Sequence, residues 1–282
     1  MTALLRAEHL SCALPSSDGE RTLFRDLLLQ VESGEIVDLT GPSGSGKSSL
    51  LTALAQLNPH ASGDLALRGR PASAFTPQQW RTQVTYLPQQ AILTGGTVAE
   101  AIRLPFTLAV RNGGANGAEG AEDAYDGGRR RFPSLLRGAD RHTADRLDDA
   151  AIRRMLDALG CGDIELNRPP HGLSGGQAAR IALARTLLTR PKVLLADEVD
   201  AGLDDDNAAK VAAIMTRAAH DGMAIIRIRH RPPDGASSRT LVLSDGRLHG
   251  NDATHDSGSN DMQAAAHADG SRSGTARPEE EV

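Results

Sequence analysis

One glycine-rich stretch constrains the architecture of this chain more than any other: Gly41-Pro42-Ser43-Gly44-Ser45-Gly46-Lys47-Ser48. It fits the pattern G-x-x-x-x-G-K-[ST], whose glycines let successive backbone N–H groups turn inward around a phosphate. The pattern requires a strand before it and a helix after it, because the helix N-terminus adds its dipole to the loop. Both flanks fit: residues 36–40 are mainly apolar, and leucines recur at helical spacing over residues 47–57. The sequence therefore predicts a strand, a phosphate-binding loop and a helix in direct succession.

The end of this stretch carries the side chains that a nucleoside triphosphate requires. The Lys47 ammonium reaches the β- and γ-phosphates, and the Ser48 hydroxyl ligates Mg²⁺. We assign Ser49 to the same nucleotide-binding group. The alternative is an ordinary glycine-rich turn, but the chain has only three lysines, so a chance match to the pattern is rare.

Strands and helices alternate through the rest of the chain. The apolar spacing predicts a helix over 144–159, a helix over 175–189, a strand over 193–196, a helix over 206–220 and a strand over 224–228. Thr143 can cap the first of these helices and Gly160 can close it, whereas Pro191 follows the second. Such alternation implies an α/β fold with a mainly parallel sheet covered by helices.

A second motif opens the helix predicted from residue 175: Leu173-Ser174-Gly175-Gly176-Gln177. Alone, it is a capped helix start with Ser174 as the N-cap residue, and backbone N–H groups at such a start suit a γ-phosphate. Together with the phosphate loop, it resembles the ATP-binding subunits of ABC transporters, whose signature is LSGGQ. The resemblance covers about residues 4–250 and implies that all five signature residues contact ATP.

The same resemblance implies a fold and its subdivision. We expect a P-loop NTPase of the ABC type over residues 1–250, with a mainly parallel sheet core and an antiparallel β subdomain. A helical subdomain would occupy about residues 93–165. It would contain a flexible insertion at 111–142, which is rich in Gly, Ala, Asp and Arg. Residues 251–282 lack Leu, Ile and Phe, so we expect a disordered polar tail there.

The resemblance implies three catalytic residues for ATP hydrolysis, Gln89, Glu198 and His230, and makes Gln89 and Asp197 ligands of Mg²⁺ together with Ser48. Residues 86–89 resemble the Q-loop of the family, which would place Gln89 near Mg²⁺ and the attacking water. The apolar run ending in Asp197 and Glu198 resembles the Walker B motif. Asp197 would hold Mg²⁺ through water, and Glu198 would orient or deprotonate the hydrolytic water. Taken alone, an Asp-Glu pair is more often a solvated strand end.

Two more positions follow in the family's order. Residues 199–204 stand where its D-loop would be, and we count Asp204 among the nucleotide contacts. His230 comes after the strand predicted at 224–228 and resembles the switch histidine that contacts the γ-phosphate. A histidine considered alone would more often be a surface loop residue.

The chain departs from the family pattern in its first strand and beside the phosphate loop. The family stacks adenine on an aromatic residue, but Cys12 and Leu14 occupy the corresponding positions here. This loss predicts weaker ATP binding or relaxed base selectivity. Asp38 lies in a strand that should be buried, where an unpaired acid is costly, and the sequence assigns it no function.

The composition excludes several other classes of protein. Acidic residues outnumber basic ones by 36 to 31, for a net charge of −5, so no nucleic-acid partner is expected. Cys12 and Cys161 have no metal-ligand spacing and cannot form a disulfide scaffold. No run approaches the roughly 18 apolar residues of a membrane span, and the charged N-terminus does not fit a signal peptide. We therefore expect a cytoplasmic chain.

The family resemblance implies two partners. Cassettes of this family meet head to tail, with the phosphate loop of one facing the signature of the other, so we expect a second cassette in a homodimer. An integral membrane transporter subunit would dock on residues 90–110 and hold the chain at the cytoplasmic face of the cell membrane. A looser similarity, over residues 97–106, is to iron-export cassettes. The alternatives are a non-transport ABC ATPase acting on ribosomes or DNA, and a regulatory nucleotide-binding subunit.

Overall fold

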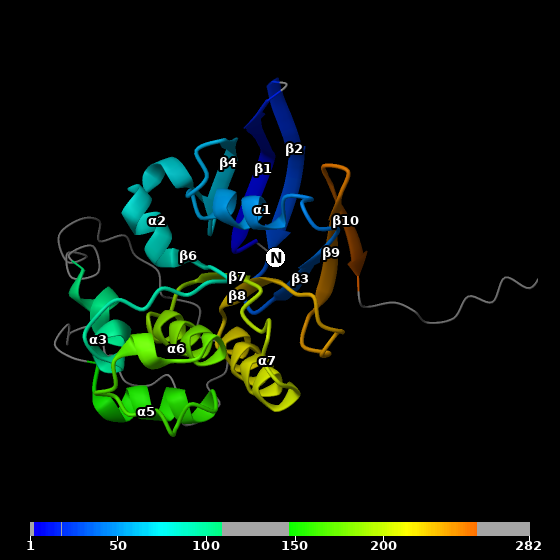
Figure 1. Ribbon diagram of the computed structural model, residues 1–282. Coiled ribbons are helices and arrows are strands. Elements are labelled where there is room, and N and C mark those ends of the chain that lie inside the picture. The colour runs from blue at the N-terminus through cyan, green and yellow to red at the C-terminus, as the bar shows by residue number, and fades with distance from the viewer. Residues whose placement is uncertain (1–2, 18, 109–146, 253–282) are drawn as a thin grey trace, which may run out of the picture.

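The computed structural model describes residues 3–17, 19–108 and 147–252, which form two sheets and a set of helices, most of them gathered below the larger sheet (Figure 1). The predicted insertion at 111–142 lies outside the described residues. So does the predicted tail, except for residues 251 and 252, which end the last strand. The described residues confirm the predicted α/β fold.

The central sheet has six strands in the order β10-β9-β3-β8-β7-β6. Their bounds are β3 Ile36–Thr40, β6 Val84–Leu87, β7 Val193–Asp197, β8 Ala224–Ile228, β9 Arg239–Ser244 and β10 Arg247–Asp252. From β9 to β6 neighbouring strands run parallel, and β10 pairs with β9 in the antiparallel sense. The sheet is therefore mainly parallel, as predicted, and the carboxyl ends of five strands meet at one edge.

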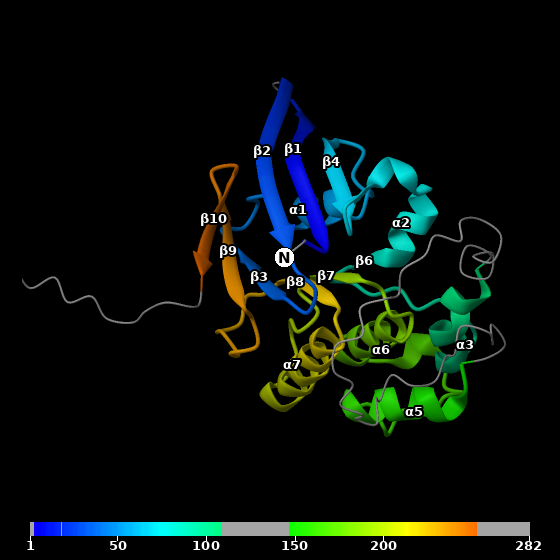
Figure 2. The same cartoon turned by 180° about the vertical axis from the view of Figure 1, so that it is seen from behind.

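A second, antiparallel sheet lies beside the first helix. Its strands, in the order β2-β1-β4-β5, are β1 Leu5–Ser16, β2 Gly19–Val31, β4 Ala61–Leu67 and β5 Arg70–Pro71. Helix α1 (Lys47–Leu54) follows the phosphate loop and packs between this sheet and the central one (Figures 1 and 2). This sheet is the antiparallel subdomain that the family resemblance implied.

The buried strands of the central sheet send alternate side chains to opposite faces. In β7, Val193 and Leu195 join the core shared with α1 and the antiparallel sheet, whereas Leu194 joins the core on the helical side. Figure 2 shows the helices of that side gathered below the central sheet. The two nucleotide motifs thus begin helices on opposite faces of one sheet, since α1 packs on the first face and α6 on the second.

The four helices predicted from apolar spacing are present and differ at their ends, and the structure adds two short helices that were not predicted individually. Besides α1, the described helices are α2 Pro77–Gln83, α3 Val98–Arg103, α5 Asp149–Ala158, α6 Gly175–Leu188 and α7 Asp205–His220, with short 3-10 turns at Ala72–Ala74, Leu104–Thr107 and Pro170–Gly172. Helix α1 ends at Leu54 rather than residue 57, because the chain turns at Gln56, which has a φ of 53°. Helix α5 begins at Asp149, where the Asp148 carboxylate caps Ala151 N–H; Thr143 lies outside the described residues.

The buried Asp38 finds a partner that the sequence did not reveal. The Nε atom of Arg227, on the adjacent strand β8, donates to Asp38 Oδ1 at 2.6 Å. Both side chains are less than a tenth exposed. An acid in this strand is tolerated because a buried arginine, 189 positions away in sequence, neutralises it.

Candidate functional site

The candidate site lies at the edge where the parallel strands of the central sheet end. Four neighbouring strands, in the order β3-β8-β7-β6, continue into the phosphate loop, the His230 segment, the Asp197–Glu198 pair and Gln89. Because carboxyl ends of parallel strands share one edge, the topology brings together motifs that are far apart in sequence.

The phosphate loop is wrapped around its own lysine. The Lys47 side chain is buried, and its Nζ atom donates to the carbonyl oxygens of Gly41 at 2.9 Å and Pro42 at 3.0 Å. The Ser45 hydroxyl is buried and has no hydrogen-bond partner among the described residues. A buried donor without a partner is costly, and a phosphate oxygen would supply the missing acceptor. The loop therefore suits the anion that its sequence predicts.

Three predicted catalytic residues meet around one carboxylate. Glu198 Oε2 accepts a hydrogen bond from Gln89 Nε2 at 2.7 Å, and Glu198 Oε1 lies 2.7 Å from His230 Nε2. Glu198 also has a left-handed backbone, with a φ of 50°, which is uncommon for a residue other than glycine. Such a conformation persists only where the surroundings enforce it, and it is frequent at functional sites.

Tyr86 is a site residue that the sequence analysis did not identify. Its hydroxyl donates to Oδ2 of the buried Asp197 at 2.8 Å, across the pair of strands β6 and β7. Burial and the neighbouring carboxylate raise the pKa of Tyr86 above its usual value, so the hydroxyl keeps its proton and remains a donor. The sequence signal was weak: Tyr86 sits three positions before Gln89, and only the strand pairing places it against Asp197.

The signature residues form a capping box at the start of helix α6. Ser174 Oγ accepts from Gln177 N–H at 3.2 Å, and the Gln177 side chain accepts from Ser174 N–H at 3.0 Å. A Cβ on Gly176 would lie 2.9 Å from Leu203 Cδ2, so the signature packs closely against the end of that leucine side chain. Since α6 lies on the other face of the sheet from α1, the structure does not bring this motif to the phosphate loop of the same chain.

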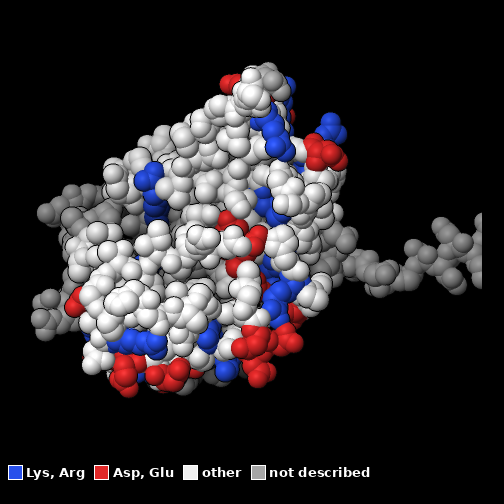
Figure 3. Space-filling model, in the orientation of Figure 1, with Lys and Arg blue, Asp and Glu red and all other residues white. Residues whose placement is uncertain are grey.

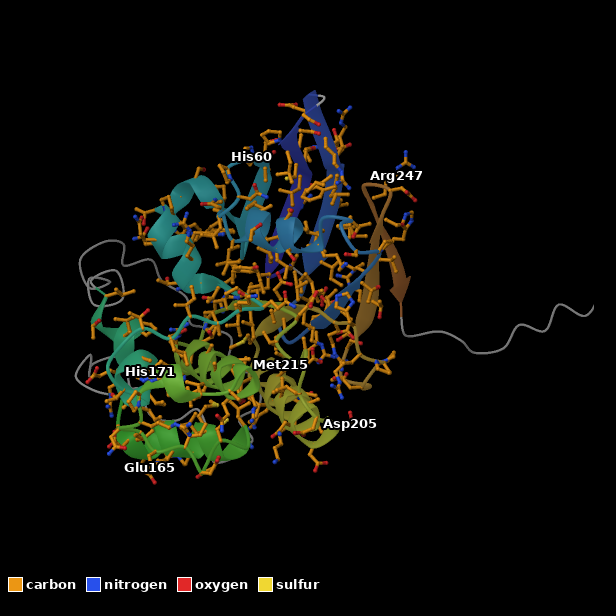
Figure 4. The ribbon with its side chains drawn as sticks, viewed as in Figure 1. His60, Glu165, His171, Asp205, Met215 and Arg247 are labelled. Carbon is orange, nitrogen blue, oxygen red and sulfur yellow. The ribbon has the colours of Figure 1, made fainter. Side chains whose placement is uncertain are left out.

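Asp204 caps helix α7. Its carboxylate accepts from the backbone N–H of Asn207 at 2.8 Å and from Asn207 Nδ2 at 2.7 Å, and these bonds lower the pKa of Asp204. Asp205 and Asp206 follow in the first turn, where negative charge suits the helix dipole. Figure 3 shows acidic side chains gathered near the start of α7, where Figure 4 labels Asp205.

Of the two positions proposed for the missing aromatic residue, Leu14 fits the geometry better. Cys12 is buried in the core, and burial raises the pKa of its thiol. Leu14 is only partly buried and pairs with Arg21 on β2. The Arg21 guanidinium in turn lies 3.4 Å from the carbonyl oxygen of Gly44, in the phosphate loop. Leu14 is therefore an aliphatic side chain whose strand partner contacts the loop.

Comparison with known proteins identifies the family to which the chain is similar. The family model described as "ABC transporter" matches residues 24–201. The chain is 29% identical over 254 residues to the macrolide export ATP-binding/permease protein MacB of Salmonella typhi, and this covers 88% of the chain but 34% of MacB. It is 32% identical over 232 residues to the lipoprotein-releasing system ATP-binding protein LolD 2 of Caulobacter vibrioides, which covers 82% of the chain and 90% of that protein.

A solved structure shares the fold. The chain superposes with a TM-score of 0.64 on the ATP-binding cassette MJ0796, solved as a dimer in a post-hydrolysis state with ADP and Pi. The sequence identity is 21%, and the match covers 88% of this chain and 98% of that one.

Proposed function

The chain belongs to the ABC transporter family as one of its ATPase cassettes, and from this premise we propose that it hydrolyses ATP in a closed dimer to drive a membrane-embedded subunit. One observation carries the proposal: the Glu198 carboxylate is held between Gln89 and His230, at the sheet edge where β3 leads into the phosphate loop. A carboxylate in this position can orient a water molecule for attack on a phosphate.

The phosphate loop binds the triphosphate. Its backbone N–H groups and the N-terminus of α1 face the anion, and Lys47 exchanges its carbonyl acceptors for β- and γ-phosphate oxygens. The Ser45 hydroxyl gains an acceptor in the same step. Residues 41–49 thus neutralise negative charge on the β- and γ-phosphates.

The donor set also fits Mg²⁺. Ser48, Gln89 and Asp197 offer hydroxyl, amide and carboxylate oxygens, which are the hard ligands that this ion prefers. No group of three or more His, Cys, Asp or Glu side chains among the described residues is arranged to hold a metal ion. Mg²⁺ commonly binds through one or two carboxylates together with substrate phosphates and water, which would complete its coordination here. When bound, Mg²⁺ neutralises charge that develops on the phosphates.

Hydrolysis requires a second cassette. Glu198 accepts a proton from the attacking water, Gln89 holds the carboxylate in place, and His230 contacts the γ-phosphate. The N-terminus of α6 in the other cassette, from Ser174 to Gln177, closes over the same phosphate. We propose a homodimer, because the chain carries one phosphate loop and one signature on opposite faces of its sheet.

The membrane subunit is proposed to dock beside Gln89. A cavity of about 360 Å³ opens there, lined by Tyr86, Pro88, Pro105, Leu108 and Arg185 among others. No helix in the described parts of the chain is long and apolar enough to cross a membrane. We propose a peripheral location at the cytoplasmic face of the membrane, which the family membership supports. We also propose metal ions, with iron the first to examine, as the cargo, on the loose likeness of residues 97–106 to iron-export cassettes.

Affinity capture tests this proposal. Tagged Glu198→Gln with Mg-ATP, incubated with detergent-solubilised membranes, should retain a multi-span membrane protein. The same variant carrying Lys47→Ala, which weakens ATP binding, should lose it. Capture of ribosomes or of DNA-bound factors in place of a membrane protein would overturn the transport assignment in favour of a non-transport ATPase.

Replacing Leu14 by tyrosine should tighten nucleotide binding. A base–aromatic stack contributes about 1–3 kcal/mol, which corresponds to roughly 5- to 150-fold in Kd. We expect the wild type to bind ATP, GTP and ITP with similar affinity, and Leu14→Tyr to bind ATP more tightly, as measured by titration calorimetry. Leu14→Met, which adds no ring, is the control. A strong preference of the wild type for ATP would contradict the prediction.

Replacing Tyr86 by phenylalanine should weaken the Mg²⁺ site. The ring stays in place, but Asp197 loses the hydrogen bond that fixes its carboxylate. Removing such a supporting bond costs about 10- to 100-fold in metal affinity. The Mg²⁺ concentration for half-maximal hydrolysis should rise by at least tenfold, as should the Kd for Mn²⁺ measured by electron paramagnetic resonance without turnover.

Thr85→Val is the matched control for this experiment. It removes a neighbouring hydroxyl of the same strand that donates to the Arg81 carbonyl. Equal Mg²⁺ dependence in Tyr86→Phe and Thr85→Val would show that the tyrosine hydroxyl does not support the metal site.

A further inference from the structure

Two arginines flank His230 in the sequence, and both of them bind the loop that follows Glu198. Arg229 comes directly after strand β8 and donates through Nε to Asp200 Oδ2 at 2.8 Å. Arg231 donates through Nη1 to the carbonyl oxygen of Leu203 at 2.7 Å and pairs with Asp205. The segment from residue 200 to 205 is therefore held at both ends by the neighbours of His230.

The Arg229 contact is the more deeply buried of the two. Arg229 is 8% exposed and Asp200 is 7% exposed, whereas the Asp205 side chain is almost fully exposed. Arg229 Nη1 also lies 2.9 Å from Oδ2 of Asp234. A buried guanidinium between two carboxylates has little freedom to move, because any displacement would leave a charge unpaired away from water.

The Arg229–Asp200 ion pair lies next in sequence to the two residues proposed to act in hydrolysis. Asp200 is two residues after Glu198, and Arg229 is one residue before His230. The Arg229–Asp200 ion pair therefore joins the same two loops as the contact between Glu198 and His230. Glu198 N–H also donates to Ile228 O at 3.2 Å, which ties the strained backbone of Glu198 to the end of β8.

We propose that Arg229 and Asp200 are positioning residues for hydrolysis: their ion pair sets the separation between the Glu198 carboxylate and the His230 imidazole. Neither residue touches the nucleotide in this assignment, so the pair governs turnover and leaves ATP affinity unchanged. The inference rests on the proposed function, in which Glu198 acts on the attacking water.

Asp200→Asn is the decisive variant, because it keeps the shape of the side chain and removes its charge. We expect kcat to fall by about 10- to 100-fold, the loss that follows small misplacements of a reacting group. The Kd for a fluorescent ATP analogue should stay within about twofold of the wild-type value, since the phosphate loop is unchanged. Neutralising both partners, in Asp200→Asn with Arg229→Gln, should restore part of the lost kcat.

A readout independent of turnover comes from NMR. The imidazole signal of His230, assigned with His230→Asn, should shift in Asp200→Asn toward its position in Glu198→Gln, because both changes disturb the same contact. If Asp200→Asn fails to fold, Arg229→Lys takes its place, with the same expected separation of kcat from Kd. It retains the positive charge but cannot reproduce the planar donor geometry of arginine.

Glu35→Gln is the matched control. It disrupts another partly buried ion pair, Arg239 Nε to Glu35 Oε1 at 2.6 Å, at the start of strand β3 and away from the catalytic loops. We expect lower thermal stability and an unchanged kcat for folded protein. The inference is overturned if Asp200→Asn behaves like Glu35→Gln, or if kcat and ATP affinity fall together. Absence of hydrolysis by the wild type would instead overturn the proposed function.

Discussion

Glu198→Gln is expected to slow ATP hydrolysis by about 10²- to 10⁴-fold while ATP binding stays unchanged. The amide keeps the size of the carboxylate and its ability to hold Gln89 or His230, but it cannot accept a proton from water. Because ATP then persists between the cassettes, the closed dimer should accumulate. Phosphate release and size-exclusion chromatography with Mg-ATP measure the two effects.

An acidic residue away from the site provides the control for Glu198→Gln. Glu165 forms an exposed ion pair with Arg153, and Glu165→Gln should leave both hydrolysis and dimerisation at wild-type levels. If Glu198→Gln retains more than about a tenth of the wild-type rate, another group must act on the water, and the assignment of Glu198 would have to be abandoned.

Gly41→Ala is expected to have the largest effect on stability. A Cβ at this position would lie 2.2 Å from the carbonyl oxygen of Leu243, and the φ of 141° is one that side chains rarely adopt. The backbone strain alone costs about 1–3 kcal/mol, and the clash adds to it. We expect a loss of roughly 3 kcal/mol or more, or about 10 °C in Tm, together with loss of ATP binding.

Gly44→Ala separates the cost of backbone strain from the cost of a steric clash. Gly44 also has a positive φ, of 75°, but a Cβ there would meet nothing within 4 Å. We expect it to cost only about 1 kcal/mol, which is the penalty of a left-handed backbone. Thermal unfolding of both variants checks the prediction, and equal losses would show that the contact with Leu243 is not what requires glycine at position 41.

The sequence predicted the elements that local patterns determine. Apolar runs placed strands β7 and β8 to within one residue, and the two glycine-rich motifs located the starts of α1 and α6. Each of these signals lies within a few neighbouring residues, so reading them requires no knowledge of the fold.

Contacts between distant residues could not be read in this way. Tyr86 and Asp197 are separated by 111 positions, and Arg227 and Asp38 by 189, so only the strand order brings them together. The same holds for the two arginines that flank His230, to which the sequence analysis gave no role and which the fold places against residues 200–205.

The strand order also has a consequence for folding during synthesis on the ribosome. Strand β3, which carries the phosphate loop, is flanked by β8 and β9, and about 180 further residues must be made before β8 begins. At 5–20 residues per second this delay is roughly 10–40 s. Throughout that interval the strand has neither neighbour, and the chain also lacks His230, so the site that the fold assembles is incomplete. The enzyme becomes competent only when its last parallel strands have emerged.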